Sequence, residues 1–306
     1  MRIALIGQAA FAEKVLEGLH SRDQEIVHVF APPDAPGGRA DPLKLKAEAL
    51  GLPLSQPKSF RGEAALEHFK SLRADLAILA FVTIIVPEPI LYLPTFKSIC
   101  FHPSLLPRHR GASAINWAII QGDAETGVTV FWPDAGIDTG PIILQKRTPI
   151  GPDETTGSLY FDRLFPLGVE TVLESVELIA AGKAPAIVQD ESLATYDPIC
   201  RDEHAQIDFA KPPREVYNLV RGCDPQPGAW TTLSGKRLRF YEPAFDPKPA
   251  SAAPGTIISV DERGMAVALD GATMIVKRVR MDPAPKKLAP KELAATADLI
   301  AGARLG

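Results

Sequence analysis

The chain has 306 residues, of which 46% are hydrophobic and 23% are charged, and its formal net charge is −4. This composition predicts a soluble globular protein with one or two cores, and the charge argues against a surface that binds nucleic acid over its whole extent. Cys100, Cys200 and Cys223 are an odd number at wide spacing with no pairwise metal pattern, so we expect neither a disulfide framework nor a zinc site, and a reducing compartment.

Neither the N-terminus nor the most apolar run of the chain resembles an export signal or a membrane span. Too few apolar residues precede Gly7 for the core of a secretion signal. The apolar run at residues 76–86 is followed directly by Pro87, and it is about half as long as the ~20 residues of a spanning helix. We interpret the run as a buried strand with its exit loop, and we expect a cytoplasmic protein without membrane contact.

Short runs of branched residues alternate with helical patterns in the first part of the chain. This alternation is typical of the βαβ units of a parallel sheet, whose ligands bind beyond the carboxyl ends of the strands. His102 directly follows a predicted strand, so it lies where chemistry is expected. We predict strands at residues 2–6, 26–30, 75–81, 97–101 and 127–132, and helices at residues 10–20, 42–50, 63–72 and 112–121.

The second part of the chain has a different pattern of predicted elements. A helical pattern at residues 155–181 ends at Gly182, which suits a C-cap, and an extended linker follows. Beyond about residue 199 we predict a small, mostly β domain with one helix at 214–221, for which a barrel of five or six strands would fit. Its hairpin turns are expected at residues 233–236 and 269–272, and a final helix is expected at 290–304.

The loop after the first strand carries only part of a dinucleotide-binding pattern. Gly7 is present, but residues 8–12 lack the second and third glycines that let a pyrophosphate approach the backbone. We therefore predict an ordinary strand-to-helix turn and no NAD. The chain has no phosphate loop elsewhere, and we expect no metal because His109, seven residues after His102, has no further ligands at suitable spacing.

His102 and Asp138 are the candidate catalytic pair. Asp138 lies in a loop bracketed by glycines, residues 134–140, after the next predicted strand. A carboxylate beside an imidazole can hold its tautomer, raise its pKa, or take a proton from an attacking water or amine. From the residues alone the spacing could also be coincidence. A helix beginning near Ala112 would aim free backbone N–H groups at the same place, which favours a site.

The segment from His102 to Gly140 resembles the folate-dependent formyltransferase family. That family has a His just before Ser-Leu-Leu-Pro and a downstream Asp in a Gly-x-Asp-Thr-Gly loop, and this chain has both, at residues 102–107 and 136–140. The run at residues 102–117 particularly resembles the hydrolase domain of 10-formyltetrahydrofolate dehydrogenase, and the chain is also similar to methionyl-tRNA formyltransferase. Further similarity lies at residues 40–43, 164–166, 194–196, 221–222 and 227–230.

The resemblance implies an α/β fold with a Rossmann-like, mostly parallel catalytic domain and a small OB-like barrel domain. We place the catalytic domain at residues 1–183, a linker at 184–203 and the OB-like domain at 204–306. It also implies 10-formyltetrahydrofolate as the formyl donor, with His102 stabilising the oxyanion and Asp138 orienting His102 and accepting a proton. The implied folate and formyl pocket is lined by Phe81, Ile84, Val86, Ser104, Leu105, Leu106, Pro107, Arg110, Gly111, Asp134, Gly136, Ile137 and Gly140, together with Ile142.

Cys100 is the main departure from the family pattern. Transferases of the family have Asn at this position, two residues before the His, and the hydrolase-type relatives lack that Asn. Losing an oxyanion-hole donor typically costs ~10²–10³ in rate when the rest of the site expects it, so a site built around Cys100 favours a different acceptor. Two interpretations of Cys100 stay open: a catalytic thiol that accepts the formyl group, or a cysteine that only packs at a strand end.

The acceptor of the formyl group is therefore the open question. We expect hydrolysis of 10-formyltetrahydrofolate or transfer to a thiol, alone or with a separate carrier protein. Alternatives are formylation of methionyl-tRNA or of an amino sugar, and a non-catalytic folate- or RNA-binding module. The short loop at residues 32–44, with only Arg39 and Lys44 positive, favours the first expectation. Basic runs at residues 236–239 and 277–280 are either an RNA-binding stripe or solvated strand faces.

Overall fold

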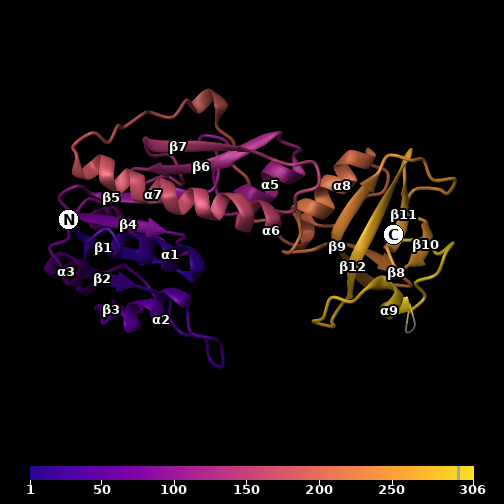
Figure 1. Ribbon diagram of the computed structural model, residues 1–306, viewed down its shortest axis with the longest axis horizontal. Helices are drawn as coiled ribbons and strands as arrows, with labels where there is room; N and C mark the ends of the chain where they lie inside the picture. The colour runs from indigo at the N-terminus through magenta and orange to yellow at the C-terminus, as the bar shows by residue number, and fades with distance from the viewer. Residues whose placement is uncertain (295–296) are drawn as a thin grey trace. The chain divides into compact units, whose positions relative to one another are not determined.

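The structure is a computed structural model that describes residues 1–294 and 297–306. It contains two compact units whose segments alternate along the chain (Figure 1). The domain boundaries predicted after residues 183 and 203 stay a prediction. Unit 1 consists of Met1–Gly111, Gly127–Thr148 and Arg163–Tyr196, and unit 2 consists of Ala112–Thr126, Pro149–Asp162 and Asp197–Gly306.

Unit 1 is built on a seven-stranded sheet of order β3-β2-β1-β4-β5-β6-β7. The first five strands pair in parallel, whereas β6 runs antiparallel to β5, with His102 opposite Thr129. β4 is buried along its whole length, as expected of a strand covered on both faces. The strands are β1 (Arg2–Gly7), β2 (Glu25–Phe30), β3 (Leu54–Ser55), β4 (Leu76–Ala80), β5 (Ser98–His102), β6 (Glu125–Phe131) and β7 (Ile142–Pro149).

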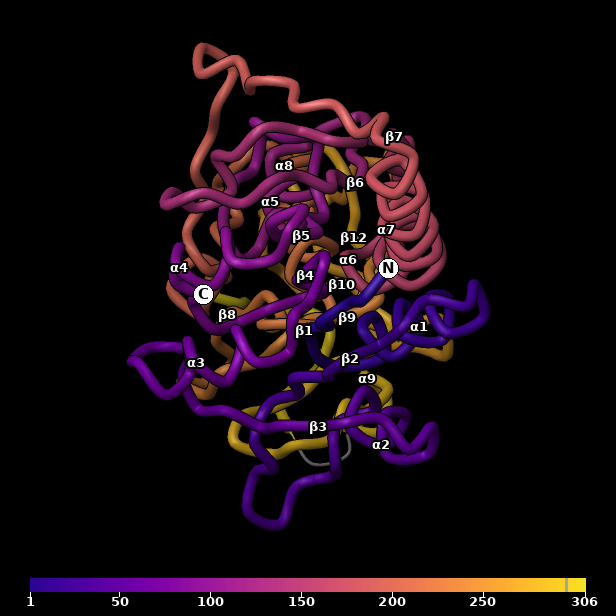
Figure 2. Tube along the Cα trace, turned by 90° about the vertical axis from the view of Figure 1, so that its left-hand side faces the viewer, coloured from indigo at the N-terminus to yellow at the C-terminus, as the bar shows by residue number. Residues whose placement is uncertain are grey.

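Helices cover both faces of this sheet. Figure 2 shows α1 (Ala9–His20) and α7 (Phe165–Ala180) on one side, and α3 (Glu63–Ser71) and α4 (Glu88–Leu91) on the other. α2 (Pro42–Ala49) packs beside α1. On the α1 side, the ring of Phe11 stacks on Phe101 of β5 with 4.2 Å between ring centroids. These layers confirm the predicted α/β fold with a mostly parallel sheet.

The helix predicted at residues 155–181 is confirmed over residues 156–180, and its helix type changes along its length. The chain forms α6 (Thr156–Leu159), a π-helical segment (Tyr160–Leu164) and then α7, which has Pro166 in its first turn. Proline lacks a backbone N–H and is tolerated in the first turn of a helix, so α7 begins there. Gly182 follows α7 with a φ of +65°, as predicted for its end. No helix among the described residues is long and apolar enough to span a membrane.

Unit 2 contains a five-stranded antiparallel sheet of order β10-β11-β12-β9-β8, which confirms the predicted small β domain. The turn from β8 to β9 has positive φ at both Ser234 (+50°) and Gly235 (+76°), the geometry of a two-residue hairpin. α5 (Ala114–Ile120) packs on α8 (Pro213–Gly222). The strands are β8 (Ala229–Leu233), β9 (Lys236–Asp246), β10 (Ile257–Asp261), β11 (Gly264–Leu269) and β12 (Ala272–Met281).

The prediction of a helix at residues 290–304 was wrong over most of its length. α9 (Pro290–Ala294) is a single short helix, residues 295–296 lie outside the described residues, and residues 297–304 are not helical. Leu299 and Leu305 are buried in the core of unit 2, and Leu305 N–H donates to the carbonyl of Gly255 at 2.9 Å. The chain end is therefore held by core packing, and its apolar residues do not form a helical stripe.

Candidate active site

His102 was predicted to follow its strand directly. In the structure it is the last residue of the strand, β5. Its side chain is buried, with 5% of its surface exposed. Nε2 lies 2.8 Å from the carbonyl oxygen of His109. A carbonyl only accepts, so Nε2 carries a proton, and Nδ1 is the nitrogen that faces Asp138, 3.5 Å from Oδ2.

Asp138 reaches His102 by a different route from the one expected. Since β6 is antiparallel to β5, the chain leaves β6 at Phe131, which lies opposite Cys100 in the middle of β5, and it runs away from His102. The loop at residues 132–141 then folds back, and Asp138 Oδ2 accepts a hydrogen bond of 2.9 Å from Gly111 N–H. Oδ1 accepts no hydrogen bond from the described part of the chain. The carboxylate is thus held at one oxygen and open at the other.

The shape of this loop depends on its glycines and on Asp134. A Cβ on Gly140 would lie 1.7 Å from the carbonyl oxygen of Trp132, so no other residue fits there. Asp134 Oδ1 accepts from Gly136 N–H at 3.1 Å and from the Thr139 hydroxyl at 2.5 Å. Two predicted substrate-binding residues, Asp134 and Gly136, therefore also shape the loop. Ile137, at its tip, is 68% exposed.

The turn after His102 is clamped to the neighbouring strands. The hydroxyl of Thr129 on β6 donates to the carbonyl of Ser104 at 2.6 Å and accepts from Leu106 N–H at 3.3 Å. Gln145 of β7 donates to the carbonyl of Leu106 at 3.0 Å. Ser104 and Leu106 are buried, whereas Leu105 and Pro107 keep partly exposed side chains.

Cys100 lies on β5 and packs against Leu106, Phe131 and Ile142. Burial raises the pKa of the thiol, and the negative charge of Asp138 raises it further. A thiol with a raised pKa stays protonated at neutral pH, and the thiolate is the nucleophilic form. The surroundings of Cys100 therefore favour the packing interpretation over the catalytic one.

Arg110, predicted to bind substrate, has a fully buried side chain whose five N–H groups are all engaged. Nη1 and Nη2 donate to the two carboxylate oxygens of Glu191 at 2.9 and 2.6 Å, and Nη1 also donates to the Tyr196 hydroxyl at 2.7 Å. Nε and Nη2 donate to Gln189 at 3.2 and 2.8 Å. The side chain thus has no N–H left for a ligand, while Gly111 beside it binds Asp138.

Gln189, Glu191 and Thr195 were missed as site residues because their stretch was expected to be a linker. The only sequence signal there was the similarity at residues 194–196. In the structure most side chains of this stretch are exposed, but the stretch is tied to unit 1 by its backbone: Ile187 pairs with Ile142 of β7, and Arg110 N–H donates to the carbonyl of Thr195 at 2.9 Å. A buried arginine in the motif requires such partners, but its partners cannot be identified from spacing.

Two cavities of unit 1 lie near the predicted pocket loops. One, of about 190 Å³, lies at the carboxyl ends of β1, β2 and β4, where strand order reverses, and Ile84 is among its lining residues. The other, of about 370 Å³, is lined by Tyr92, Trp132 and Asp134 among others. Phe81 and Ile84 are partly exposed, at 37% and 38%, whereas Val86 is buried. Apolar walls with a few polar groups are typical of small-molecule sites.

Comparison with known proteins identifies the family. A family model described as formyl transferase matches residues 1–174, and one described as formyl transferase, C-terminal domain, matches residues 200–297. The chain belongs to the formyl transferase family. The resemblance seen in the sequence is thereby confirmed, and the enzymes of this family are folate-dependent.

Individual relatives agree with this assignment. The chain is 43% identical over 250 residues to the cytosolic 10-formyltetrahydrofolate dehydrogenase of Xenopus laevis, a match that covers 80% of the chain but only 28% of that protein. It is 38% identical over 311 residues to the methionyl-tRNA formyltransferase of Geotalea daltonii, covering 100% of the chain and 98% of the relative. HypX from Aquifex aeolicus in complex with tetrahydrofolic acid shares the fold, with a TM-score of 0.70, 21% identity, and 96% and 46% of the two chains covered.

The loop after β1 in this formyl transferase is occupied by an internal carboxylate. Ala9 N–H donates to both oxygens of Asp41, at 3.0 and 2.9 Å. A Cβ on Gly7 would lie 2.5 Å from the carbonyl oxygen of Ala80, so the turn is also tightly packed. A phosphate approaching this amide would meet the negative charge of Asp41. Among the described residues, no group of three or more His, Cys, Asp or Glu side chains could hold a metal ion.

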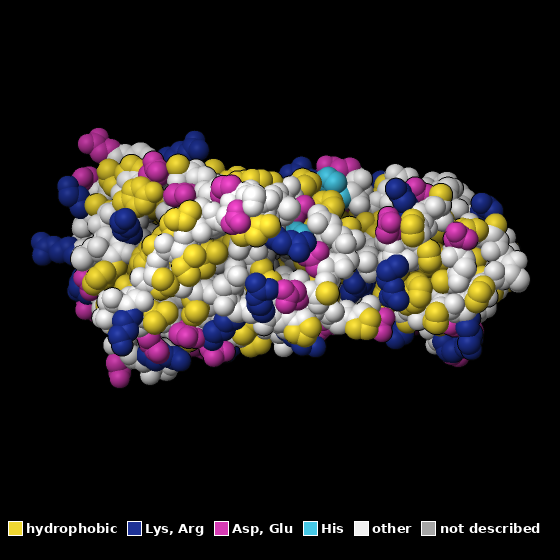
Figure 3. Space-filling model, turned by 90° about the horizontal axis from the view of Figure 1, so that it is seen from above, with side chains coloured by type: hydrophobic (Ala, Val, Ile, Leu, Met, Phe, Trp, Pro, Cys, Tyr) yellow, Lys and Arg dark blue, Asp and Glu magenta, His cyan; other side chains and the backbone are white. Residues whose placement is uncertain are grey.

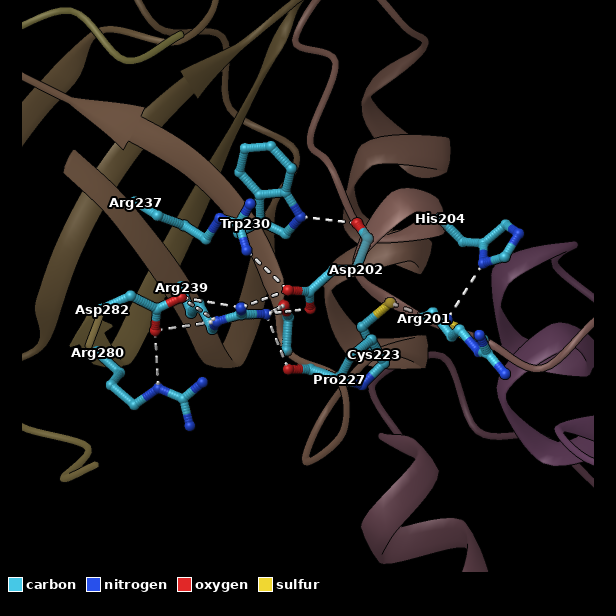
Figure 4. Close-up of polar contacts among 12 residues, drawn as sticks. Arg201, Asp202, His204, Cys223, Pro227, Trp230, Arg237, Arg239, Arg280 and Asp282 are labelled. Carbon is cyan, nitrogen blue, oxygen red and sulfur yellow. Dashed lines mark hydrogen bonds and ion pairs between the residues drawn. The ribbon is translucent and has the colours of Figure 1, made fainter. Parts of the chain in front are cut away.

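Three of the six basic side chains in the two basic runs of unit 2 are paired with acids. Arg237 and Arg239 both contact Asp202, and Arg239 and Arg280 both contact Asp282 (Figure 4). On the face seen in Figure 3, charged side chains of both signs are interspersed among hydrophobic ones. The pairing lowers the net positive charge that these runs offer to a polyanion, which favours the interpretation as strand faces.

Proposed function

We propose that this formyl transferase removes the formyl group of 10-formyltetrahydrofolate and passes it to water, or to a thiol acceptor. The observation that carries the proposal is the His102 and Asp138 pair, with Nδ1 3.5 Å from Oδ2 and both side chains anchored by the backbone of residues 109 and 111. The pair lies where the family motif predicts its catalytic groups, beside partly exposed apolar residues that suit a pterin ring.

The proposed chemistry is addition and elimination at the formyl carbon. The oxygen of water attacks this carbon, its proton passes to Oδ1 of Asp138, and a tetrahedral intermediate forms whose oxyanion is stabilised by His102. The bond between the formyl carbon and N10 then breaks, and N10 receives the proton. The products are formate and tetrahydrofolate. With a thiol as acceptor, the same steps give a thioester in place of formate.

The choice of water or a thiol over tRNA as the acceptor rests on how few unpaired basic side chains the described residues have for binding the phosphates of a tRNA. Of the two basic side chains at residues 32–44, Lys44 at the start of α2 is paired with Asp34, so Arg39 is the one positive charge there without an acidic partner among the described residues. In unit 2, Arg237, Arg239 and Arg280 are likewise paired with Asp202 and Asp282. A tRNA acceptor is bound mainly through its phosphates, and this requires basic side chains available to them. A small neutral acceptor requires none.

Methionyl-tRNA formylation is the second candidate. It is favoured by the match to the methionyl-tRNA formyltransferase of Geotalea daltonii, which spans both units and nearly the full length of that enzyme. The dehydrogenase match covers 28% of its relative, so it supports a formyl-releasing domain and says nothing of the relative's remaining activities.

One experiment separates these candidates. The protein is incubated with 10-formyltetrahydrofolate alone, with a small thiol, or with charged initiator tRNA, and the release of tetrahydrofolate is followed spectrophotometrically. We expect release without tRNA, with formate as the second product. Release that depends strictly on tRNA would replace the first proposal by the second. The absence of release under all three conditions would reject both.

A further inference from the structure

Gln189 of unit 1 holds the loop that carries Asp138. Its amide nitrogen donates to the backbone carbonyls of Asp138 at 2.8 Å and of Gly140 at 2.7 Å. The side chain is 6% exposed, so water does not compete for these bonds. Asp138 itself has a φ of +56°, in the left-handed region that non-glycine residues seldom adopt. The bond to its carbonyl helps to hold this conformation.

Arg110 in turn orients Gln189. The amide oxygen of Gln189 accepts from Nη2 of Arg110 at 2.8 Å and from Nε at 3.2 Å. A guanidinium only donates and a carbonyl only accepts, so the amide of Gln189 has a single orientation that satisfies all its partners. Both N–H groups and the oxygen of the amide are engaged. Gln189 therefore connects the buried Arg110 to the loop of Asp138 through an amide whose hydrogen-bonding groups are all engaged.

The backbone on either side of Arg110 contacts both members of the pair. The carbonyl of His109 accepts from Nε2 of His102 at 2.8 Å, and Gly111 N–H donates to Oδ2 of Asp138 at 2.9 Å. This short segment is tied to Thr195, whose hydroxyl accepts from His109 N–H at 2.7 Å. A displacement of Arg110 would consequently move the partner groups of both side chains at once.

We propose that Gln189, held by Arg110, is a positioning residue for the formyl transfer, one that sets the distance between the Asp138 carboxylate and the His102 ring. The proposal rests on the proposed function, and Gln189 acts only through Asp138. The distance of 3.5 Å between Nδ1 and Oδ2 lies at the edge of hydrogen bonding, so a small shift of the loop makes or breaks the contact. Misplacement by about 1 Å can cost ~10²-fold in rate.

The test compares the same substitution at two glutamines. Gln189→Glu keeps an oxygen for Arg110 but replaces the two N–H donors by an oxygen that faces carbonyls. Gln24→Glu is the matched control: Gln24 Nε2 also donates to a backbone carbonyl, that of Arg22 at 3.1 Å, but at the amino end of β2. We expect Q189E to lower kcat by ~10–100-fold with the KM for 10-formyltetrahydrofolate within about threefold, and Q24E to match the wild type.

Gln189→Met separates the hydrogen bonds from the added charge, and a similar fall of kcat in Q189M is expected. Thermal melting measures the folded fraction of each variant. A kcat of Q189E equal to that of Q24E would overturn the proposal. So would a fall of kcat that only follows the loss of folded protein.

A readout independent of turnover keeps the two proposals apart. The His102 ring is titrated by NMR, with its signal assigned by its loss in His102→Asn; Asp138 is the titratable group that contacts it. We expect the pKa of His102 to differ from wild type in Q189E and Q189M but not in Q24E. If wild-type protein releases no tetrahydrofolate, the proposed function fails. The titration alone then tests whether Gln189 positions Asp138 relative to His102. An unchanged titration would then overturn the role of Gln189.

Discussion

Arg110 in unit 1 and Arg239 in unit 2 are buried in nearly the same way. Arg110 is 0% exposed and Arg239 is 5% exposed. Each engages all the N–H groups of its guanidinium, Arg110 with Glu191 as its acidic partner and Arg239 with Asp202 and Asp282 (Figure 4). Hydrogen bonds to these acids raise the pKa of both arginines. A buried cation requires such complete pairing.

The two arginines differ in what their neighbouring residues contact. The residues that flank Arg110 contact His102 and Asp138. The guanidinium of Arg239 donates to the carbonyls of Pro227 and Gly228, and its partner Asp202 contacts Arg237 and the indole N–H of Trp230. A saturated buried arginine therefore does not by itself indicate a functional site. The neighbours of Arg110 differ because they contact a carboxylate, that of Asp138, whose Oδ1 accepts no hydrogen bond from the described residues and is available to a substrate.

The largest expected effect is at the end of the Arg110 network. Asp138→Asn keeps an oxygen that can accept from Gly111 N–H, but it removes the negative charge and the proton acceptor. We expect kcat to fall by ~10²–10⁴-fold with little change in melting temperature. Tetrahydrofolate release and thermal melting measure the two effects. Wild-type turnover in D138N would remove Asp138 from the chemistry.

Substituting lysine for each arginine tests the comparison directly. Lysine keeps the charge but loses the planar fork that serves several acceptors. We expect Arg110→Lys to lower kcat by ~10–100-fold, and Arg239→Lys to leave kcat per folded molecule unchanged while lowering the free energy of unfolding by about 2 kcal/mol. Steady-state kinetics and urea unfolding separate these outcomes. Equal effects of the two variants on kcat would abolish the distinction between the clusters.

Acid should weaken the cluster of unit 2 in a defined pH range. The hydrogen bond from Arg239 is the main reason that the pKa of Asp202 is lowered from its usual 3.8. A carboxylate with a lowered folded pKa stabilises the fold above its unfolded pKa, and this stabilisation is lost as the pH falls through the folded value. We expect Asp202→Asn to have a lower melting temperature than the wild type at pH 7. This difference in melting temperature should become smaller below about pH 3.8. A difference that is independent of pH would contradict this assignment.

The smallest expected effect is at Cys100. Since burial and the charge of Asp138 raise its pKa, we expect the thiol to stay protonated and unreactive at neutral pH. We expect Cys100→Ala to retain turnover within about threefold of the wild type, and iodoacetamide to leave Cys100 unlabelled in the folded protein. Loss of turnover in C100A, in protein that still melts normally, would return Cys100 to the catalytic set.

The strands and helices of both units were largely predictable because they depend on local patterns. The run from Arg2 to Gly7 is branched and apolar, and Ser234-Gly235 supplies the positive φ of a hairpin turn, so β1 and the turn from β8 to β9 follow from neighbouring residues alone. Where tertiary packing decides, the prediction failed: the chain end was expected to be helical and is instead held by Leu299 and Leu305.

The sequence by itself determined the family, the proposal of His102 and Asp138 as the catalytic pair, and the glycines that shape the loop of Asp138, because residue type and spacing are properties of the chain. Only the tertiary structure decided how the two side chains meet, since the antiparallel direction of β6 is set by pairing with β5. It also decided the partners of Arg110. Gln189 and Glu191 are some eighty residues away in sequence, and no local pattern encodes a contact that only folding creates.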